Sequence, residues 1–119
     1  MQAVKKILVV DDDENILNLL ELSLSNPRFN IDKARGGEEA LQMSKENKYD
    51  LVLLDLMMPK MDGLETCRMM RKHINTPIII LSAKQEKESR TESLNVSGYI
   101  TKPFDPDELL ATISKYFQN

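Results

Sequence analysis

The sequence holds a single cysteine, Cys67, in 119 residues. A disulfide within the chain is therefore excluded, and so is a metal site built from cysteine ligands. No apolar run approaches the roughly 18 residues that a membrane-spanning helix needs. The first apolar run, 7–10, is also too short for the core of a signal peptide, and no small-residue cleavage site follows it. We therefore expect a cytoplasmic protein that does not act at a membrane.

The sequence also has no excess of basic residues, with 16 Lys and Arg against 19 Asp and Glu. The net charge of -3 argues against direct nucleic-acid binding, because domains that bind nucleic acid usually carry a basic patch. Internal repeats, low-complexity tracts and linkers are not found. With 41% hydrophobic and 29% charged residues, the chain has the composition of an ordinary globular protein. We expect one domain over residues 1–119.

Apolar runs of strand length recur along the chain, at 7–10, 29–31, 51–54, 78–81 and 99–100, of which 29–31 is weak. Three of them, at 7–10, 51–54 and 78–81, are continuously apolar rather than alternating. Continuous apolar runs are typical of parallel strands that are covered on both faces.

The stretches between these runs have helical spacing. Apolar stripes predict helices around 16–24, 40–43, 64–70 and 109–117. Asp13, Asp62 and Asp105 are suitable N-caps for three of them. A further helix at 86–95 is expected to be short or mobile, because this segment is nearly all polar. Five strands that alternate with five helices predict an α/β fold with a parallel sheet between two helical layers.

Polar residues come directly after four of the apolar runs. Asp11, Asp12 and Asp13 follow the first, Asp55 the third, Ser82 the fourth, and Thr101-Lys102 the fifth. Ligands of such sheets bind beyond the carboxyl ends of the strands. We therefore expect these side chains to converge on one edge of the sheet.

Converging carboxylates repel one another unless a cation lies between them. Oxygen ligands beside a phosphate suit Mg2+. Lys102 adds a positive charge, and Ser82 adds a hydroxyl donor. Such a site would let a carboxylate attack phosphorus while the metal ion and the lysine neutralise the transferring group.

Four motifs with this spacing resemble the receiver domains of bacterial two-component systems over essentially the whole chain. They are VVDDD at 9–13, DLMMPKMDG at 55–63, LSA at 81–83 and YITKPF at 99–104. The resemblance implies a flavodoxin-like, doubly wound sheet of five parallel strands in the order 2-1-3-4-5, with five helices.

The resemblance also implies roles for the matching residues. Asp55 resembles the phospho-acceptor of the family, and Lys102 its lysine. Asp11 and Asp12 are similar to the acidic pair at the Mg2+ ion, with Asp12 the expected direct ligand. The backbone carbonyl of Met57 is the remaining expected ligand, beside Asp55 itself.

Ser82 and Tyr99 are similar to the switch pair of the family, in which a hydroxyl moves toward the phosphoryl group and an aromatic ring turns inward behind it. From the residues alone, Ser82 is also open to the less favoured interpretation as an N-cap, and Tyr99 is equally open to being a core or edge packing residue. The family resemblance further implies a cis bond between Lys102 and Pro103.

The function implied is a phosphorylation-controlled signalling switch without turnover of an independent substrate. A histidine kinase or a histidine phosphotransfer protein would phosphorylate Asp55, and a downstream protein would read the change, as in a phosphorelay. Two alternatives remain open here. One is a small aspartate-nucleophile phosphatase of the haloacid-dehalogenase type, although Asn15 breaks its motif. The other is a binding module that is never phosphorylated.

Two departures from the family pattern stand out. The segment from Ser82 to Lys102 is about two residues shorter than in the chemotaxis regulator, which affects the expected fourth helix. Met57 is apolar where some relatives have a polar residue. We hypothesise that it hinders the hydrolytic water and lengthens the life of the phosphorylated state.

Overall fold

The structure is a computed structural model, and it describes residues 4–56, 63–83 and 96–117. Its centre is a sheet of five parallel strands in the order β2-β1-β3-β4-β5, as predicted. The strands are β1 (Lys5–Val10), β2 (Phe29–Ala34), β3 (Leu51–Asp55), β4 (Ile78–Ala83) and β5 (Gly98–Lys102). All five apolar runs are therefore confirmed as strands.

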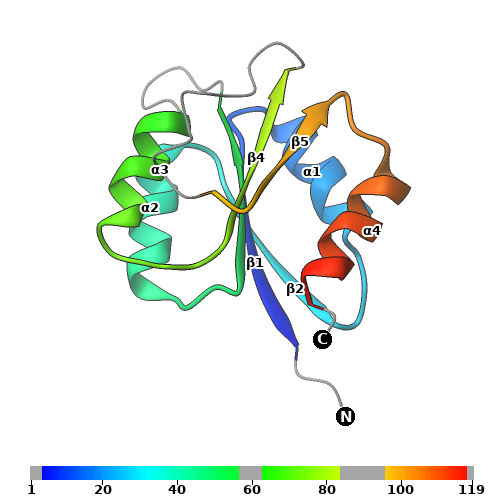
Figure 1. Cartoon of the computed structure of the whole chain (residues 1–119), viewed down its shortest axis with the longest axis horizontal. Coiled ribbons are helices and arrows are strands. Elements are labelled where there is room, and N and C mark those ends of the chain that lie inside the picture. Colours follow the sequence, from blue (N-terminus) through cyan, green and yellow to red (C-terminus); the bar gives the residue numbers. More distant parts are fainter. Residues whose placement is uncertain (1–3, 57–62, 84–95, 118–119) are drawn as a thin grey trace.

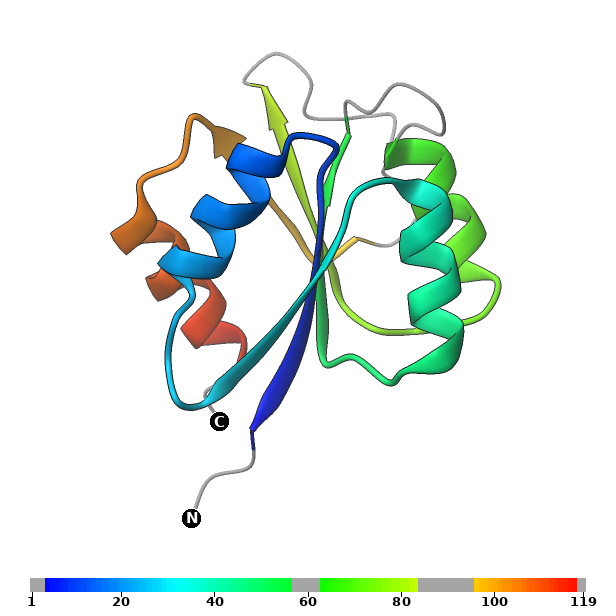
Figure 2. The same ribbon diagram turned by 180° about the vertical axis from the view of Figure 1, so that it is seen from behind.

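Four helices cover the sheet in the described part of the chain. They are α1 (Glu14–Ser23), α2 (Gly37–Glu46), α3 (Gly63–Arg71) and α4 (Pro106–Tyr116). The helices α1 and α4 lie on one face of the sheet, and α2 and α3 lie on the other (Figures 1 and 2). The further helix predicted at 86–95 lies outside the described residues, so α4 corresponds to the last helix of the prediction.

The core consists of two layers, one on each face of the sheet. Alternate side chains of β1, β3 and β4 face opposite layers, because successive residues of a strand point to opposite sides. One layer contains Leu8, Val10, Val52, Leu54, Ile78 and Ile80, and the other contains Ile7, Val9, Leu51, Leu53, Ile79 and Leu81. All twelve side chains are buried, which is why the three runs are continuously apolar.

Side-chain caps define the starts of two helices. The Asp13 carboxylate accepts a hydrogen bond from the Asn15 amide at 2.9 Å, and Asp105 accepts one from the Asp107 amide at 2.9 Å. Both caps were predicted from the sequence. The third predicted cap, Asp62, lies outside the described residues. Cys67 is fully buried on α3, as its place on an apolar stripe predicts. None of the described helices is both long and apolar enough to span a bilayer.

The Asp105 cap leads to a stability prediction. Asp105→Ala should lower the free energy of unfolding by about 1 kcal/mol, because an amide at the start of α4 loses its acceptor. Asp105→Asn should retain most of that stability, because its side-chain oxygen can still cap. Urea unfolding of both variants tests this, and equal losses in both would contradict the role of the cap.

Candidate functional site

Carboxylates from two neighbouring strands meet at one edge of the sheet. Asp11 directly follows β1, and Asp55 is the last residue of β3. The pairing of Val10 with Leu54 brings the next residues, Asp11 and Asp55, side by side. Both are buried, with 1% and 2% of their surface exposed, whereas Asp12 is exposed. Carboxylate oxygens of the three residues lie within 4.8 Å of one another.

Lys102 reaches the same place from β5. Its Nζ donates a hydrogen bond to Oδ1 of Asp55 at 2.9 Å and lies 3.5 Å from Oδ2 of Asp11. The strand β4 lies between β3 and β5, so the lysine has to span a whole strand. The bond from Lys102 to Pro103 is cis, as the family resemblance implied.

The two oxygens of Asp11 have different surroundings. Oδ1 accepts a hydrogen bond from the Asp13 amide at 3.0 Å, which holds the carboxylate toward β3. Oδ2 is buried and accepts no hydrogen bond from any residue that the structure describes. The Lys102 ammonium at 3.5 Å offsets only part of the cost of burying this oxygen, and a bound cation would offset more of it.

Burial dominates the electrostatics of Asp11. It raises the pKa of this carboxyl from 3.8 to about 6, with further raising by the negative charges of Asp55 and Asp12. The Asp13 amide and the positive charge of Lys102 act in the opposite direction. For Lys102, burial lowers the pKa, but the hydrogen bond with Asp55 and the charges of Asp55 and Asp11 outweigh it and raise the pKa above its ordinary value.

The donor set fits a hard divalent cation. The three carboxylates supply only oxygen ligands. Together with the ammonium group of Lys102 they leave a local net charge of about -2, which a divalent cation would balance. The backbone carbonyl of Met57, the fourth predicted protein ligand, lies outside the described residues.

Ser82 lies one position beyond the residue that pairs with Asp55. Leu81 is the β4 partner of Asp55, and Ser82 pairs with Thr101 of β5. The side chain is buried, and its Oγ has no hydrogen-bond partner in the described part of the chain. Because Ser82 lies within a strand, it does not cap any described helix, and the N-cap alternative is not supported.

Tyr99 lies on β5 opposite Ile80, and 36% of its surface is exposed. It lines a shallow hollow on the α4 side with Phe104 and Thr112. Tyr99 is therefore not a core residue in this structure. A plain core role is not supported, whereas edge packing and the switch role both stay predictions.

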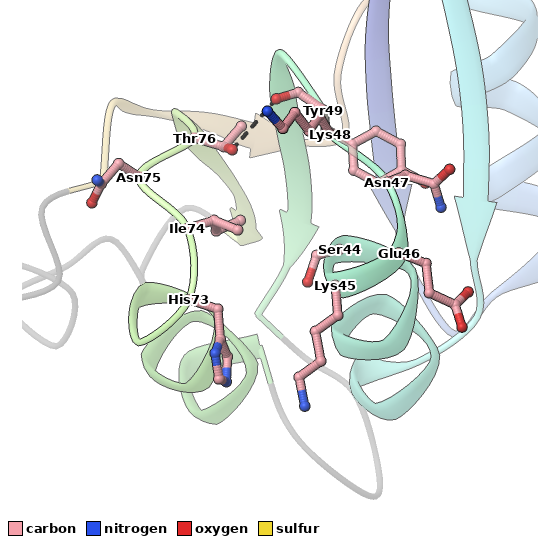
Figure 3. Close-up of a pocket in the computed structure, with 10 residues that line it drawn as sticks. All are labelled: Ser44, Lys45, Glu46, Asn47, Lys48, Tyr49, His73, Ile74, Asn75 and Thr76. Atoms are coloured by element: carbon pink, nitrogen blue, oxygen red, sulfur yellow. Dashed lines mark hydrogen bonds between the residues drawn. The ribbon is translucent and has the colours of Figure 1, made fainter.

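A separate cavity of about 650 Å³ lies at the other end of the sheet, where α2 and α3 lead into β3 and β4. Lys45 of α2 and His73, just after α3, both line it, and their side chains extend in the same direction in Figure 3. Thr76 and Tyr49 also line it, and the Thr76 hydroxyl donates a hydrogen bond to the Tyr49 carbonyl at 3.4 Å. None of the predicted site residues lines this cavity.

Comparisons with known proteins agree with this geometry. The family model of the response regulator receiver domain matches residues 7–114. The chain therefore belongs to the family of response regulator receiver domains.

Relatives in the same family cover most of this chain. Response regulator ArlR of Staphylococcus saprophyticus is 43% identical over 110 residues, which is 91% of this chain and 50% of that protein. ArlR of Staphylococcus aureus is 42% identical over the same shares. The chain thus spans about half the length of the curated relatives it matches.

Solved receiver domains have the same fold. The chemotaxis protein CheY4 of Vibrio cholerae has a TM-score of 0.85 at 30% identity, covering 95% of this chain and 98% of that one. The receiver domain of the Francisella response regulator 1452 has a TM-score of 0.83 at 37% identity, covering 93% and 94%. The predicted flavodoxin-like fold class is confirmed.

The raised pKa of Asp11 leads to a test in metal-free protein. The pKa of Asp11 is higher in the folded than in the unfolded chain. The protein therefore loses stability as the pH rises from about 4 through 6, because this buried carboxyl becomes charged. Asp11→Asn removes the buried charge. It should therefore raise the free energy of unfolding by about 1–3 kcal/mol at pH 7.5, and by much less at pH 4.

Urea unfolding in the presence of a chelator, at both pH values, measures this difference. Asp12→Asn serves as the control, because Asp12 is exposed and should change stability less. An Asp11→Asn variant that is no more stable than the wild type at pH 7.5 would show that burial of this charge is not costly.

Proposed function

We propose that this chain is a phosphorylation-controlled signalling switch that accepts a phosphoryl group on Asp55. The observation that carries the proposal is the buried Asp55 carboxylate, which accepts a hydrogen bond from Lys102 and lies beside Asp11 and Asp12. A carboxylate that is held in place and flanked by a cation is a suitable nucleophile for phosphorus.

The chemical step can be described from these residues. An oxygen of Asp55 attacks the phosphorus atom, the bond from phosphorus to the donor breaks, and the donor leaves with that electron pair. Lys102, already 2.9 Å from Asp55, neutralises charge on the transferring group and keeps the acceptor oriented. The products are an acyl phosphate on Asp55 and the dephosphorylated donor.

Mg2+ is the proposed cofactor. Asp11, Asp12, Asp55 and the backbone carbonyl of Met57 are the proposed protein ligands. When bound, the ion would balance the acidic cluster and the charge of the phosphoryl oxygens. The buried Oδ2 of Asp11, which accepts no hydrogen bond from the described residues, supports this assignment, as do the clustered carboxylates.

Ser82 and Tyr99 are the proposed switch pair. The Ser82 hydroxyl is buried on the strand next to Asp55 and can donate to a phosphoryl oxygen, and Tyr99 lies on the following strand with its ring partly exposed. A new charge at Asp55 would attract Ser82 and Lys102, and Tyr99 would turn inward behind them. The proposed output surface is the segment 86–95 with β5 and α4.

The proposed phosphodonor is a histidine kinase or a histidine phosphotransfer protein, as membership of the family implies. The proposed output is binding of a downstream protein or onward transfer of the phosphoryl group. Self-catalysed phosphorylation and dephosphorylation, without turnover of another substrate, belong to the same proposal. The phosphatase and the binding-module alternatives are not favoured, because the family match runs through nearly the whole chain.

Labelling with a small phosphodonor tests the function. With acetyl phosphate and Mg2+, the wild type should gain the mass of one phosphoryl group, and Asp55→Asn should gain none. Asp105→Asn, remote from the site, is the matched control and should label like the wild type. Mass spectrometry of the intact proteins measures this, and a wild type that stays unlabelled, or an Asp55→Asn variant that is labelled, would refute the proposal.

Met57 leads to a separate prediction about the phosphorylated state. Met57→Asn should shorten the lifetime of the acyl phosphate, because a polar side chain at this position favours the attacking water. Loss of the phosphorylated mass with time, after the donor is removed, gives the lifetime. An equal or longer lifetime in the variant would contradict the hypothesis.

A further inference from the structure

The start of α3 is packed directly against the backbone of Asp55. Gly63 is the first residue of α3, and a Cβ atom placed on it would lie 2.1 Å from the Asp55 carbonyl oxygen. The same atom would lie 2.5 Å from Cα of Leu56 and 2.8 Å from the Asp55 carbonyl carbon. All three obstacles are backbone atoms, so rotation of a side chain cannot relieve the clash.

This need for glycine is a matter of space, not of backbone conformation. No glycine in the described part of the chain has a positive φ. Gly36, the N-cap of α2, would accept a Cβ with nothing within 4 Å. The two glycines therefore form a natural pair for comparison, because both precede or begin a helix but only Gly63 contacts the acceptor residue.

Asp55 is held from two directions. On the sheet side, Asp55 pairs with Leu81, and the Leu56 amide donates to the Leu81 carbonyl at 3.1 Å. On the helix side, the Gly63 amide donates to the Leu56 carbonyl at 2.9 Å. Leu56 and Gly63 are the two residues that flank the segment containing Met57, so this hydrogen bond joins its ends.

We propose that Gly63 is a positioning residue for phosphoryl acceptance. It lets α3 approach close enough to fix the Asp55 backbone, and with it the acceptor carboxylate, at the distance from Lys102 and Asp11 that the site requires. Any side chain at position 63 would displace β3 from α3 by more than 1 Å, since ordinary contacts of a Cβ begin near 3.4 Å. This inference rests on the proposed function of Asp55.

The decisive variant is Gly63→Ala, with Gly36→Ala as its matched control. Gly63→Ala should label with acetyl phosphate about 100-fold more slowly than the wild type, the order of loss expected for a displacement near 1 Å. It should also bind Mg2+ about tenfold more weakly by calorimetric titration, as for loss of a group that orients a ligand. Gly36→Ala should match the wild type in both measurements.

A second control separates positioning from loss of stability. Cys67→Ala removes a buried side chain of the same helix and leaves a small cavity in the core, but it does not change the start of α3. This variant should therefore be less stable than the wild type and retain wild-type Mg2+ affinity. Wild-type labelling and Mg2+ affinity in Gly63→Ala would overturn the proposal. Equal losses of Mg2+ affinity in Gly63→Ala and Cys67→Ala would overturn it as well.

A measurement on the wild type covers the case in which Gly63→Ala does not fold. Mg2+ should slow hydrogen exchange of the Gly63 amide more than that of the Ala40 amide, which makes a hydrogen bond of similar length to Gly36 within α2. Equal slowing at both amides would overturn the proposal. If the wild type binds Mg2+ but is never labelled, the function of Asp55 fails, and the Mg2+ affinities and exchange rates still decide the role of Gly63.

Discussion

The burial of two carboxylates at one edge of the sheet is the constraint on which the site depends. Asp11 and Asp55 are almost completely buried and adjacent, and their charges repel. Lys102 offsets part of that repulsion through one hydrogen bond and one longer ion pair. Burial, more than this repulsion, raises the pKa of Asp11, so the folded chain holds a negative site in an environment that disfavours negative charge.

The rest of the fold holds this arrangement together. The parallel register between β1 and β3 places Asp11 beside Asp55, and both strands pack into the core on both faces. The cap at Asp13 starts α1 immediately after the acidic run, and the Asp13 amide orients the Asp11 carboxylate. The close approach of α3 then limits where the end of β3 can lie. A charge added at Asp55 would therefore act on groups that are already tightly packed.

Much of this was predictable from the sequence, because continuous apolar runs and residues at strand ends have few structural solutions. The five strands, four of the helices and the meeting of Asp11, Asp55 and Lys102 followed from such patterns. The strand β2 was the weakest signal, since it lies at the edge of the sheet and most of its inner positions are only partly buried. The strands also extend beyond their apolar runs, because backbone pairing continues where side chains are polar.

Other features depend on three-dimensional packing that a linear pattern does not record. Consecutive acids after a strand do not reveal which one is buried, and the structure buries Asp11 while Asp12 stays exposed. The exposure of Tyr99 depends on what covers β5. A glycine before a helix is usually read as a turn residue, so the contact of Gly63 with the Asp55 backbone could be found only from coordinates.

The most direct test of the account is a crystal structure of the chain with Mn2+, which takes the same oxygen ligands as Mg2+ and can be located by its anomalous scattering. The account predicts one strong anomalous peak among the carboxylates of Asp11, Asp12 and Asp55, with Lys102 still directed at Asp55. A well-ordered site without such a peak, or a peak confined to another part of the molecule, would contradict the claim that this acidic edge is built to hold a divalent cation.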